Sequence, residues 1–351
     1  MVKRLTGLLL VLCLLLALLP TNIFAAQEKD LAKSSETAQI RGYYDIGDRI
    51  PDYDGCISMQ GMAVLGDYIY SIKKSSSDSL AAIYRTNRLD GTTEQMNFDG
   101  ALTVDYLGHG NDMCAAQVGE TSYLFVSTMK KTLNALACYK ISGTTLTLVD
   151  VFDIYTKGGS NLTCSGVDVY EVSGTMLTLL IAQGDLVFMY TMDMTAPPEA
   201  LYCPLAFQVD LNYALEVARE ACGNSELELT VQGSGYYNDT YYMPLTLHHN
   251  HSTQIKADNH ADSTSVIVAF PNIADAINVT DRSVKASLTD SIYIPDAGEM
   301  FFEVESLDFA DGMLYFNTNR VRIDHSETVI SVLLDDGVDM KIFSDRKAYR
   351  H

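Results

Sequence analysis

Polar side chains recur at matching places in five segments of this chain, and these are the residues best suited to chemistry. Each segment begins with an amide, hydroxyl or carboxylate, continues with a small or short residue, and is then mostly apolar. The five leading residues are Gln60, Asn111, Ser165, Gln232 and Glu305. Such groups donate and accept hydrogen bonds, so a ring of them would suit a polyhydroxylated ligand. In the alternative, they cap one another or hold water.

Carboxylates in the same segments raise a second possibility, acid–base catalysis on a glycosidic bond. The candidates are Asp112, Asp168, Glu305 and Asp308. Glycoside hydrolysis uses two carboxyl groups on opposite sides of the bond that breaks. Asp168 and Asp308 hold the same fourth position of their segments, where the alternative role is to bond the backbone at the edge of a strand.

A histidine cluster is the one candidate for a metal site. His248, His249 and His251 form a His-His-x-His group in a polar stretch. Imidazole nitrogens can bind zinc or another transition metal. Adjacent residues of a strand point to opposite sides, however, and histidines in a polar loop are commonly solvated. We therefore expect no metal and no cofactor.

The elements that must position these groups form an internal repeat. Each of the five segments is followed by a tight turn rich in Gly, Asp or Asn and then by a second apolar or aromatic strand, which is typical of a β-hairpin. The turns lie near residues 66, 119, 174, 239 and 312. The segments start 51, 54, 67 and 73 residues apart. A period near 50 with one hairpin in each unit indicates the blades of a β-propeller.

We therefore predict an all-β fold, a five-bladed β-propeller with one helical insertion. Outer strands are expected at 80–85, 93–98, 135–141, 145–152 and 328–334, and the helix at 212–222. The last unit lacks a fourth strand, which the N-terminal stretch near 40–46 could supply, so that an N-terminal strand closes the ring. An irregular β-sandwich is the alternative.

The N-terminus has the pattern of a secretory signal peptide. Lys3 and Arg4 precede an apolar run of about 12 residues, and small residues follow at 25 and 26. The run is too short for a transmembrane helix, although an uncleaved anchor is the alternative. We predict a signal peptide at 1–26, a flexible linker at 27–39, the propeller at 40–340 and a C-terminal tail at 341–351. The protein is expected to be secreted, and a cell-wall association is left open.

Charge and cysteine content restrict the partners. The chain has 24 basic and 45 acidic residues and a net charge of −21. Such a surface repels phosphate backbones, so we expect no nucleic-acid partner. The sequence has no second apolar stretch of membrane-spanning length, so we also expect no stable membrane insertion. Six cysteines follow the signal peptide, and their scattered spacing indicates neither a zinc knuckle nor a redox motif. Their pairing and the oligomeric state are left open.

The stretch Leu107-Gly108-His109-Gly110-Asn111-Asp112-Met113 resembles a signature of Gram-positive propeller proteins. That group includes the helveticin J-like bacteriocins and the propellers of phage receptor-binding proteins similar to a teichoic-acid protein. The resemblance implies a five-bladed propeller that binds a cell-surface glycopolymer. His109, Asn111 and Asp112 match the signature in position, and the resemblance assigns them no role. The predicted signal peptide favours a secreted or wall-associated protein over a virion component.

Three functional hypotheses follow. The first is a secreted, non-catalytic propeller that binds cell-surface carbohydrate or cell-wall glycopolymer. Its expected binding residues at the channel mouth are Gln60, His109, Asn111, Asp112, Ser165, Asp168, Gln232, Glu305 and Asp308. The alternative is a glycoside-active enzyme that uses axial carboxylates, as several five-bladed propellers do. A bacteriocin-like toxin is the third.

Overall fold

A computed structural model describes residues 38–39, 44–45, 50–130, 135–222, 229–247, 265–278, 283–284, 291–294, 301–321, 328–335 and 339–341. The chain divides into two units, Met1–Glu36 and Thr37–His351. The first unit lies outside the described residues, and with it the predicted signal peptide. The second unit has an all-β propeller fold with few helices, which confirms the all-β propeller part of the prediction.

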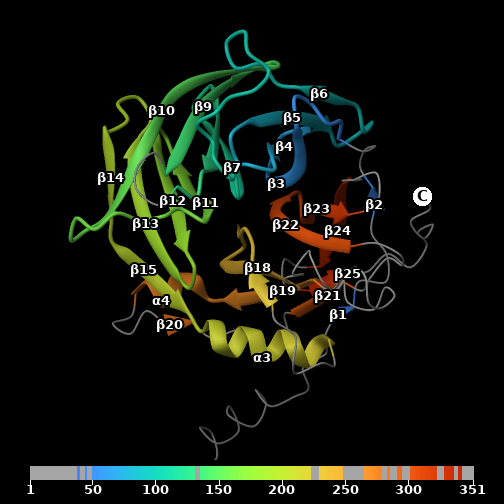
Figure 1. Ribbon diagram of the computed structural model, residues 1–351. Coiled ribbons are helices and arrows are strands. Elements are labelled where there is room, and N and C mark those ends of the chain that lie inside the picture. Colours follow the sequence, from blue (N-terminus) through green and yellow to red (C-terminus); the bar gives the residue numbers. More distant parts are fainter. Residues whose placement is uncertain are drawn as a thin grey trace, which may run out of the picture. The chain divides into compact units, whose positions relative to one another are not determined.

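The strands of the second unit form five sheets (Figure 1). The first sheet contains β3 (Cys56–Leu65), β4 (Tyr68–Ser75), β5 (Ala81–Asn87) and β6 (Thr93–Gln95). The second contains β7 (Asp112–Val118), β8 (Thr121–Ser127), β9 (Leu136–Ser142), β10 (Thr145–Thr156) and β14 (Ala200–Cys203). The third contains β11 (Gly166–Ser173), β12 (Met176–Gln183), β13 (Leu186–Asp193), β15 (Leu205–Val209) and β20 (Ser283–Val284).

The two remaining sheets include the N-terminal strands. The fourth contains β16 (Leu229–Val231), β17 (Gly235–Tyr237), β18 (Thr240–Leu247), β19 (Ser265–Pro271), β21 (Ser291–Ile294) and β1 (Ala38–Gln39). The fifth contains β22 (Phe301–Ala310), β23 (Met313–Val321), β24 (Thr328–Asp335), β25 (Asp339–Lys341) and β2 (Tyr44–Asp45). Tyr44 pairs antiparallel with Ser331 of β24, so the predicted N-terminal stretch does supply a strand to the last sheet.

All five predicted hairpins are present, and their turns explain the residues found there. Three have glycine at the first of two loop residues; Gly66, between the paired residues Leu65 and Tyr68, has a φ of 58°. This is the pattern of a type II′ turn, whose twist matches that of the strands. The other two, Asn238-Asp239 and Asp311-Gly312, have positive φ at both residues, as in a type I′ turn.

The core lies between neighbouring sheets. Five clusters of buried apolar residues occur in the described part of the chain, and each packs one sheet against the next. The cluster between the first and last sheets includes Met62, Tyr84 and Tyr315. The inner strands contact one another in the order β3, β7, β11, β17, β22, and β22 contacts β3. The sheets are therefore held by side-by-side packing of their faces.

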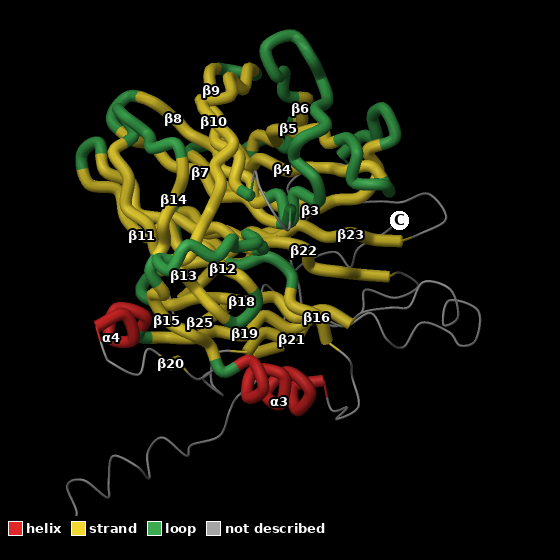
Figure 2. The backbone as a smooth tube through the Cα atoms, turned by 60° about the vertical axis from the view of Figure 1, so that its left-hand side comes forward, coloured by secondary structure: helices red, strands yellow, loops and turns green. Residues whose placement is uncertain are grey.

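Two helices in the described part of the chain lie along the outer edge of the sheets (Figures 1 and 2). The predicted helix is α3 (Leu211–Cys222), and Asp210 caps its N-terminus by accepting a hydrogen bond from Tyr213 N at 3.1 Å. The short α4 (Ile273–Asn278) was not predicted. Within the described residues, no helix has the length and apolarity needed to cross a membrane.

Candidate functional site at the centre of the sheets

The second residue of each repeat lies at the point where the inner strands meet. These residues are Gly61, Asp112, Gly166, Gly233 and Ser306. The Asp112 carboxylate is fully buried and accepts hydrogen bonds from three other sheets. The donors are Val167 N (3.0 Å), Ser234 N (3.1 Å), Ser234 Oγ (3.1 Å) and Ser306 Oγ (2.5 Å). Ser306 Oγ in turn accepts from Met62 N of the first sheet, so this network joins all five sheets.

Three of these positions must be glycine, because Asp112 and its partner Ser234 leave no room there for a side chain. A Cβ atom on Gly61 would lie 2.6 Å from the backbone carbonyl carbon of Asp112, and one on Gly233 would lie 2.7 Å from Asp112 Oδ1. A Cβ on Gly166 would lie 2.5 Å from Ser234 Oγ. Close packing where the inner strands meet therefore requires the small or short second residue seen in the sequence pattern.

Ser234 connects Asp112 to a second buried carboxyl group. Its hydroxyl lies 2.7 Å from Asp168 Oδ2 as well as 3.1 Å from Asp112 Oδ2. A hydroxyl has one hydrogen, so donation to one carboxyl group leaves it an acceptor for the other. Burial, and next the Asp112 charge, raise the pKa of Asp168 well above its ordinary range. We infer that protonated Asp168 donates to Ser234, which donates to Asp112.

The pKa of Asp112 is raised less because its four donors favour the ionised form. Burial raises it to about 7, and the hydrogen bonds from Ser306, Val167 and Ser234 oppose that shift. Asp308, at the fourth position of the last repeat, also has a pKa raised by burial, to about 7, while Val64 N and Phe309 N donate to it. The centre thus holds three carboxyl groups with raised pKa values.

These groups should make stability fall as the pH rises. An unfolded carboxyl loses its proton near pH 4, whereas Asp112, Asp168 and Asp308 retain theirs when folded, so folding binds protons above that pH. The free energy of unfolding should therefore fall between about pH 4 and 7. Asp168→Asn keeps a donor for Ser234 and should flatten this slope, as measured by urea unfolding from pH 5 to 8. Parallel curves for the variant and the parent would contradict the assignment.

Asp168, Asp308 and Cys114 lie at matching positions of three inner strands. All three occupy fourth positions of their repeats, on β11, β22 and β7. Burial raises the pKa of the Cys114 thiol, and the charges of Asp168 and then Asp308 raise it further. The Asp308 charge also contributes to the raised pKa of Asp168. The two carboxyl groups are therefore electrostatic neighbours.

The leading residues of the repeats contact the protein itself. Asn111 Nδ2 donates to Ser165 O at 2.7 Å, Ser165 Oγ donates to Ala182 O at 3.1 Å, and Gln232 Nε2 donates to Thr246 Oγ1 at 3.3 Å. Gln60 donates to the carbonyl of Met59. Glu305 is buried, and its carbonyl accepts from Gly233 N at 2.9 Å. These contacts resemble the predicted alternative of mutual capping, and ligand binding by the ring stays a prediction.

The Leu107–Met113 stretch forms the turn that leads into β7. Gly108 and Gly110 both have φ near 60°, and a Cβ on Gly110 would lie 2.6 Å from Ile72 Cδ1. His109 N donates to Thr128 O at 3.2 Å, and Gly61 N donates to Gly110 O at 2.9 Å. Each glycine of this stretch is thus required by backbone conformation or close packing.

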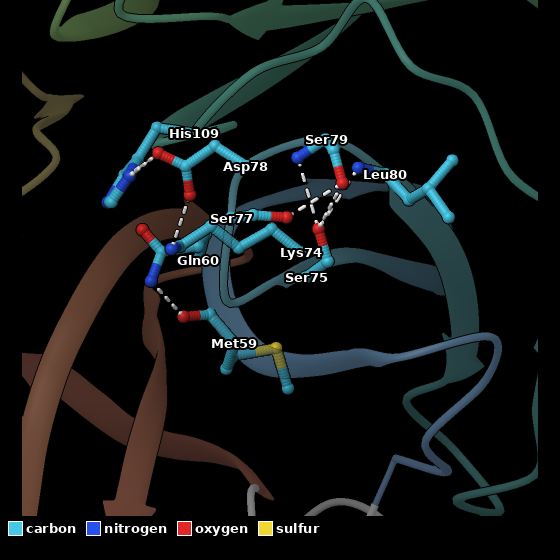
Figure 3. Close-up of polar contacts among 9 residues, drawn as sticks. All are labelled: Met59, Gln60, Lys74, Ser75, Ser77, Asp78, Ser79, Leu80 and His109. Atoms are coloured by element: carbon cyan, nitrogen blue, oxygen red, sulfur yellow. Dashed lines mark hydrogen bonds and ion pairs between the residues drawn. The ribbon is translucent and has the colours of Figure 1, made fainter.

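His109 lies away from the buried centre, in an open pocket of about 310 Å³. The pocket is lined by Asp78, Gly108, His109, Thr128, Met129 and Lys130. His109 Nδ1 lies 3.2 Å from Asp78 Oδ2, and Lys74 Nζ donates to Asp78 Oδ1 at 2.5 Å (Figure 3). Burial opposes ionisation of Asp78, but Lys74 and His109 outweigh it and lower the pKa. Burial, and next Lys74, lower the pKa of His109.

Other sequence candidates contribute less. His248, His249 and His251 lie outside the described residues, and the described part of the chain contains no cluster of His, Cys, Asp or Glu that could hold a metal. The five cysteines whose side chains are described are buried and free: Cys56, Cys114, Cys138, Cys164 and Cys203.

Sequence reasoning missed three important residues. Ser234 is the third residue of its repeat, where the other repeats have apolar residues, and this exception was the available signal. Asp78 lies in a serine-rich loop, and Lys74 lies in the strand that precedes this loop. No sequence pattern connects either residue to His109. Their proximity arises only from the packing of the first sheet beside the second.

Comparisons with known proteins identify structural neighbours only. No family model and no curated protein matches the sequence. A family-43 β-xylosidase/α-arabinofuranosidase from a compost metagenome has a TM-score of 0.43 and 10% identity, covering 86% of this chain and 98% of its own. A family-43 enzyme from Xanthomonas citri, complexed with xylose, has a TM-score of 0.40 and 10% identity, covering 88% and 95%. A family-43 β-1,3-galactosidase with galactodeoxynojirimycin has a TM-score of 0.45 and 10% identity, covering 87% and 100%.

These neighbours correct the first functional hypothesis. The sequence favoured a non-catalytic binding propeller, and that prediction is wrong: the proteins of similar structure are glycoside hydrolases, the class that the alternative named. Most polar groups of the predicted ring are engaged with the protein's own strands, and Asp112 is enclosed on all sides. Ligand binding by these residues stays a prediction.

Proposed function

We propose that this protein is a glycoside-active enzyme whose reaction uses Asp168 and Asp308. Two observations support the proposal: both carboxyl groups come from inner strands and have pKa values raised by burial, and the Asp308 charge is among the causes that raise the pKa of Asp168. A general acid in glycoside hydrolysis must keep its proton near neutral pH, and raised carboxyl pKa values serve that purpose. Asp112 is fully enclosed and serves the fold.

The environments of Asp168 and Asp308 suggest the role of each in catalysis. Asp168 has the more strongly raised pKa, so it is the proton donor to the leaving oxygen. Asp308 has a pKa of about 7 and is only partly buried, so it acts in the ionised form as the base or nucleophile. The substrate that this chemistry requires is a glycan, which is also the proposed partner.

Hydrolysis of a broad panel of aryl glycosides and polysaccharides tests this function. We expect Asp168→Asn and Asp308→Asn each to lower kcat by at least about 100-fold, the usual contribution of a general acid or base. The pH profile of kcat/KM should rise near pH 7, as Asp308 ionises, and fall at higher pH as Asp168 does.

The control is Asp105→Asn, which removes an exposed carboxylate and should leave activity unchanged. All variants are compared at equal folded fraction by near-UV circular dichroism. The function is rejected if the parent cleaves no glycoside on the panel, or if both axial variants retain full activity.

We also propose that the five sheets are the blades of one closed ring. Three observations support this: the cyclic order of contacts between inner strands, the apolar cluster between the first and last sheets, and the pairing of β2 with β24. In this arrangement the N-terminal strand β2 completes the fifth blade.

We also propose that the protein is exported through the predicted signal peptide. We further propose that it is related to the Gram-positive propellers that share the Leu107–Met113 signature. Mass spectrometry of the mature N-terminus should find cleavage after Ala25 or Ala26. An intact N-terminus in secreted material would contradict it.

A further inference from the structure

Two basic side chains and one acidic side chain lie in or beside the pocket at His109, although the chain as a whole is strongly acidic. The chain has a net charge of −21, yet Lys130 lines this pocket and Lys74 lies just behind Asp78. Both oxygens of Asp78 are occupied, one by Lys74 and one by His109. The acidic group of the pocket is therefore neutralised from within the protein, whereas Lys130 makes no ion pair with the described residues.

Lys130 is held in place by the turn below it. A Cβ atom on Gly108 would lie 3.5 Å from both Cγ and Cε of Lys130, so the alkyl chain of the lysine packs directly over this glycine. Lys130 N also donates to Thr128 Oγ1 at 3.2 Å. An ammonium held in this way loses less side-chain entropy on binding than a lysine in open solvent.

The walls of the pocket are also conformationally strained. Asp78 has a φ of 54° and Met129 a φ of 53°, although neither is glycine. Such conformations cluster at binding and catalytic sites. Asp78 can only accept hydrogen bonds when ionised, so Nδ1 of His109 carries the hydrogen, and Nε2 is left for a ligand.

We propose that this pocket binds the anionic group of a sugar-sized ligand, a carboxylate or a phosphate ester, with the Lys130 ammonium as its counter-ion. The volume of about 310 Å³ is at the lower end of small-molecule pockets, which suits a single sugar unit. His109 Nε2 can accept a hydrogen bond from a sugar hydroxyl beside the charge. The site is separate from the axial carboxylates, and the inference does not depend on hydrolysis.

Isothermal titration of the mature chain with glucuronate, glucose 6-phosphate and glucose tests the site. Glucose is the neutral control. We expect at least one anion to bind at least about 10-fold more tightly than glucose, because a hydrogen bond to a charged group is stronger than one between neutral groups. Preference for glucuronate identifies a carboxylate ligand, and preference for the phosphate identifies a phosphate ester.

Lys130→Met should lower the affinity for the preferred anion about 10-fold, and Lys130→Arg should largely restore it. Lys140→Met is the matched control, because Lys140 is exposed on β9 and outside the pocket. The proposal is overturned if no probe binds, if glucose binds as tightly as the anions, or if Lys130→Met binds like the parent. Asp168→Asn should still bind the anion, whether or not the parent hydrolyses glycosides. The anion site and the proposed enzyme function can therefore fail independently of each other.

Discussion

Asp112→Ala is expected to lower the free energy of unfolding by about 4 kcal/mol or more, enough to leave little folded protein. The substitution removes the acceptor for Val167 N, Ser234 N and the hydroxyls of Ser234 and Ser306 at a site without solvent access. Each buried donor without a partner costs about 1–3 kcal/mol. Chemical denaturation followed by circular dichroism measures the loss.

Two companion variants make this result specific. Asp112→Asn keeps one carbonyl oxygen and should fall between the parent and Asp112→Ala. Glu120→Ala removes an exposed carboxylate from the hairpin turn of the same sheet and should change stability by less than about 0.5 kcal/mol. If Asp112→Ala unfolded at the same denaturant concentration as Glu120→Ala, the central carboxylate would have no structural role.

Gly61→Ala should destabilise the protein by about 3 kcal/mol through a single added methyl group. The new Cβ would lie 2.6, 2.7 and 2.9 Å from the C, Cα and N atoms of Asp112, and these backbone atoms cannot rotate away. Overpacking of a rigid site typically costs about 1–3 kcal/mol, and the backbone contact places this case at the upper limit. The melting temperature and the denaturant midpoint should both fall.

Gly158→Ala is the matched control for this substitution. Its Cβ would meet only Thr156 Oγ1, at 3.6 Å, which is ordinary van der Waals contact. Gly158 does not have a positive φ, so the control should be neutral or slightly stabilising. A Gly61→Ala protein as stable as Gly158→Ala would show that the inner strands can separate without cost.

Local patterns predicted much of the fold. The hairpins were recognisable because turn residues with positive φ, such as Asn238-Asp239, separate runs with β-strand character, and both signals depend only on neighbouring residues. The parallel pairing of β14 with β10 was not predictable. It joins Ala200 to Asp153, and nothing in either segment alone specifies its partner.

The candidate site was predicted only in part, for a similar reason. The period of the repeat indicated correctly that Asp112, Asp168 and Asp308 come from inner strands. It could not show that Asp112 would be sealed by its own neighbours, since that depends on Ser234 and Ser306, which are 122 and 194 residues away. Likewise, His109 was selected from a motif, but its pocket is completed by Asp78 and Lys130 of other loops.

The central position of Asp112 also restricts how this chain can change in evolution. Repeat proteins commonly gain or lose whole units, because each unit contacts only its neighbours and any copy resembles the next. Here the units are not equivalent: one contributes the carboxylate, two contribute hydroxyls and the others contribute glycines that give them room. Duplication of a unit would place a second residue in a centre that is already full, and deletion would remove a donor or the acceptor. A change in the number of units would therefore require accompanying changes at Asp112 or at its donors.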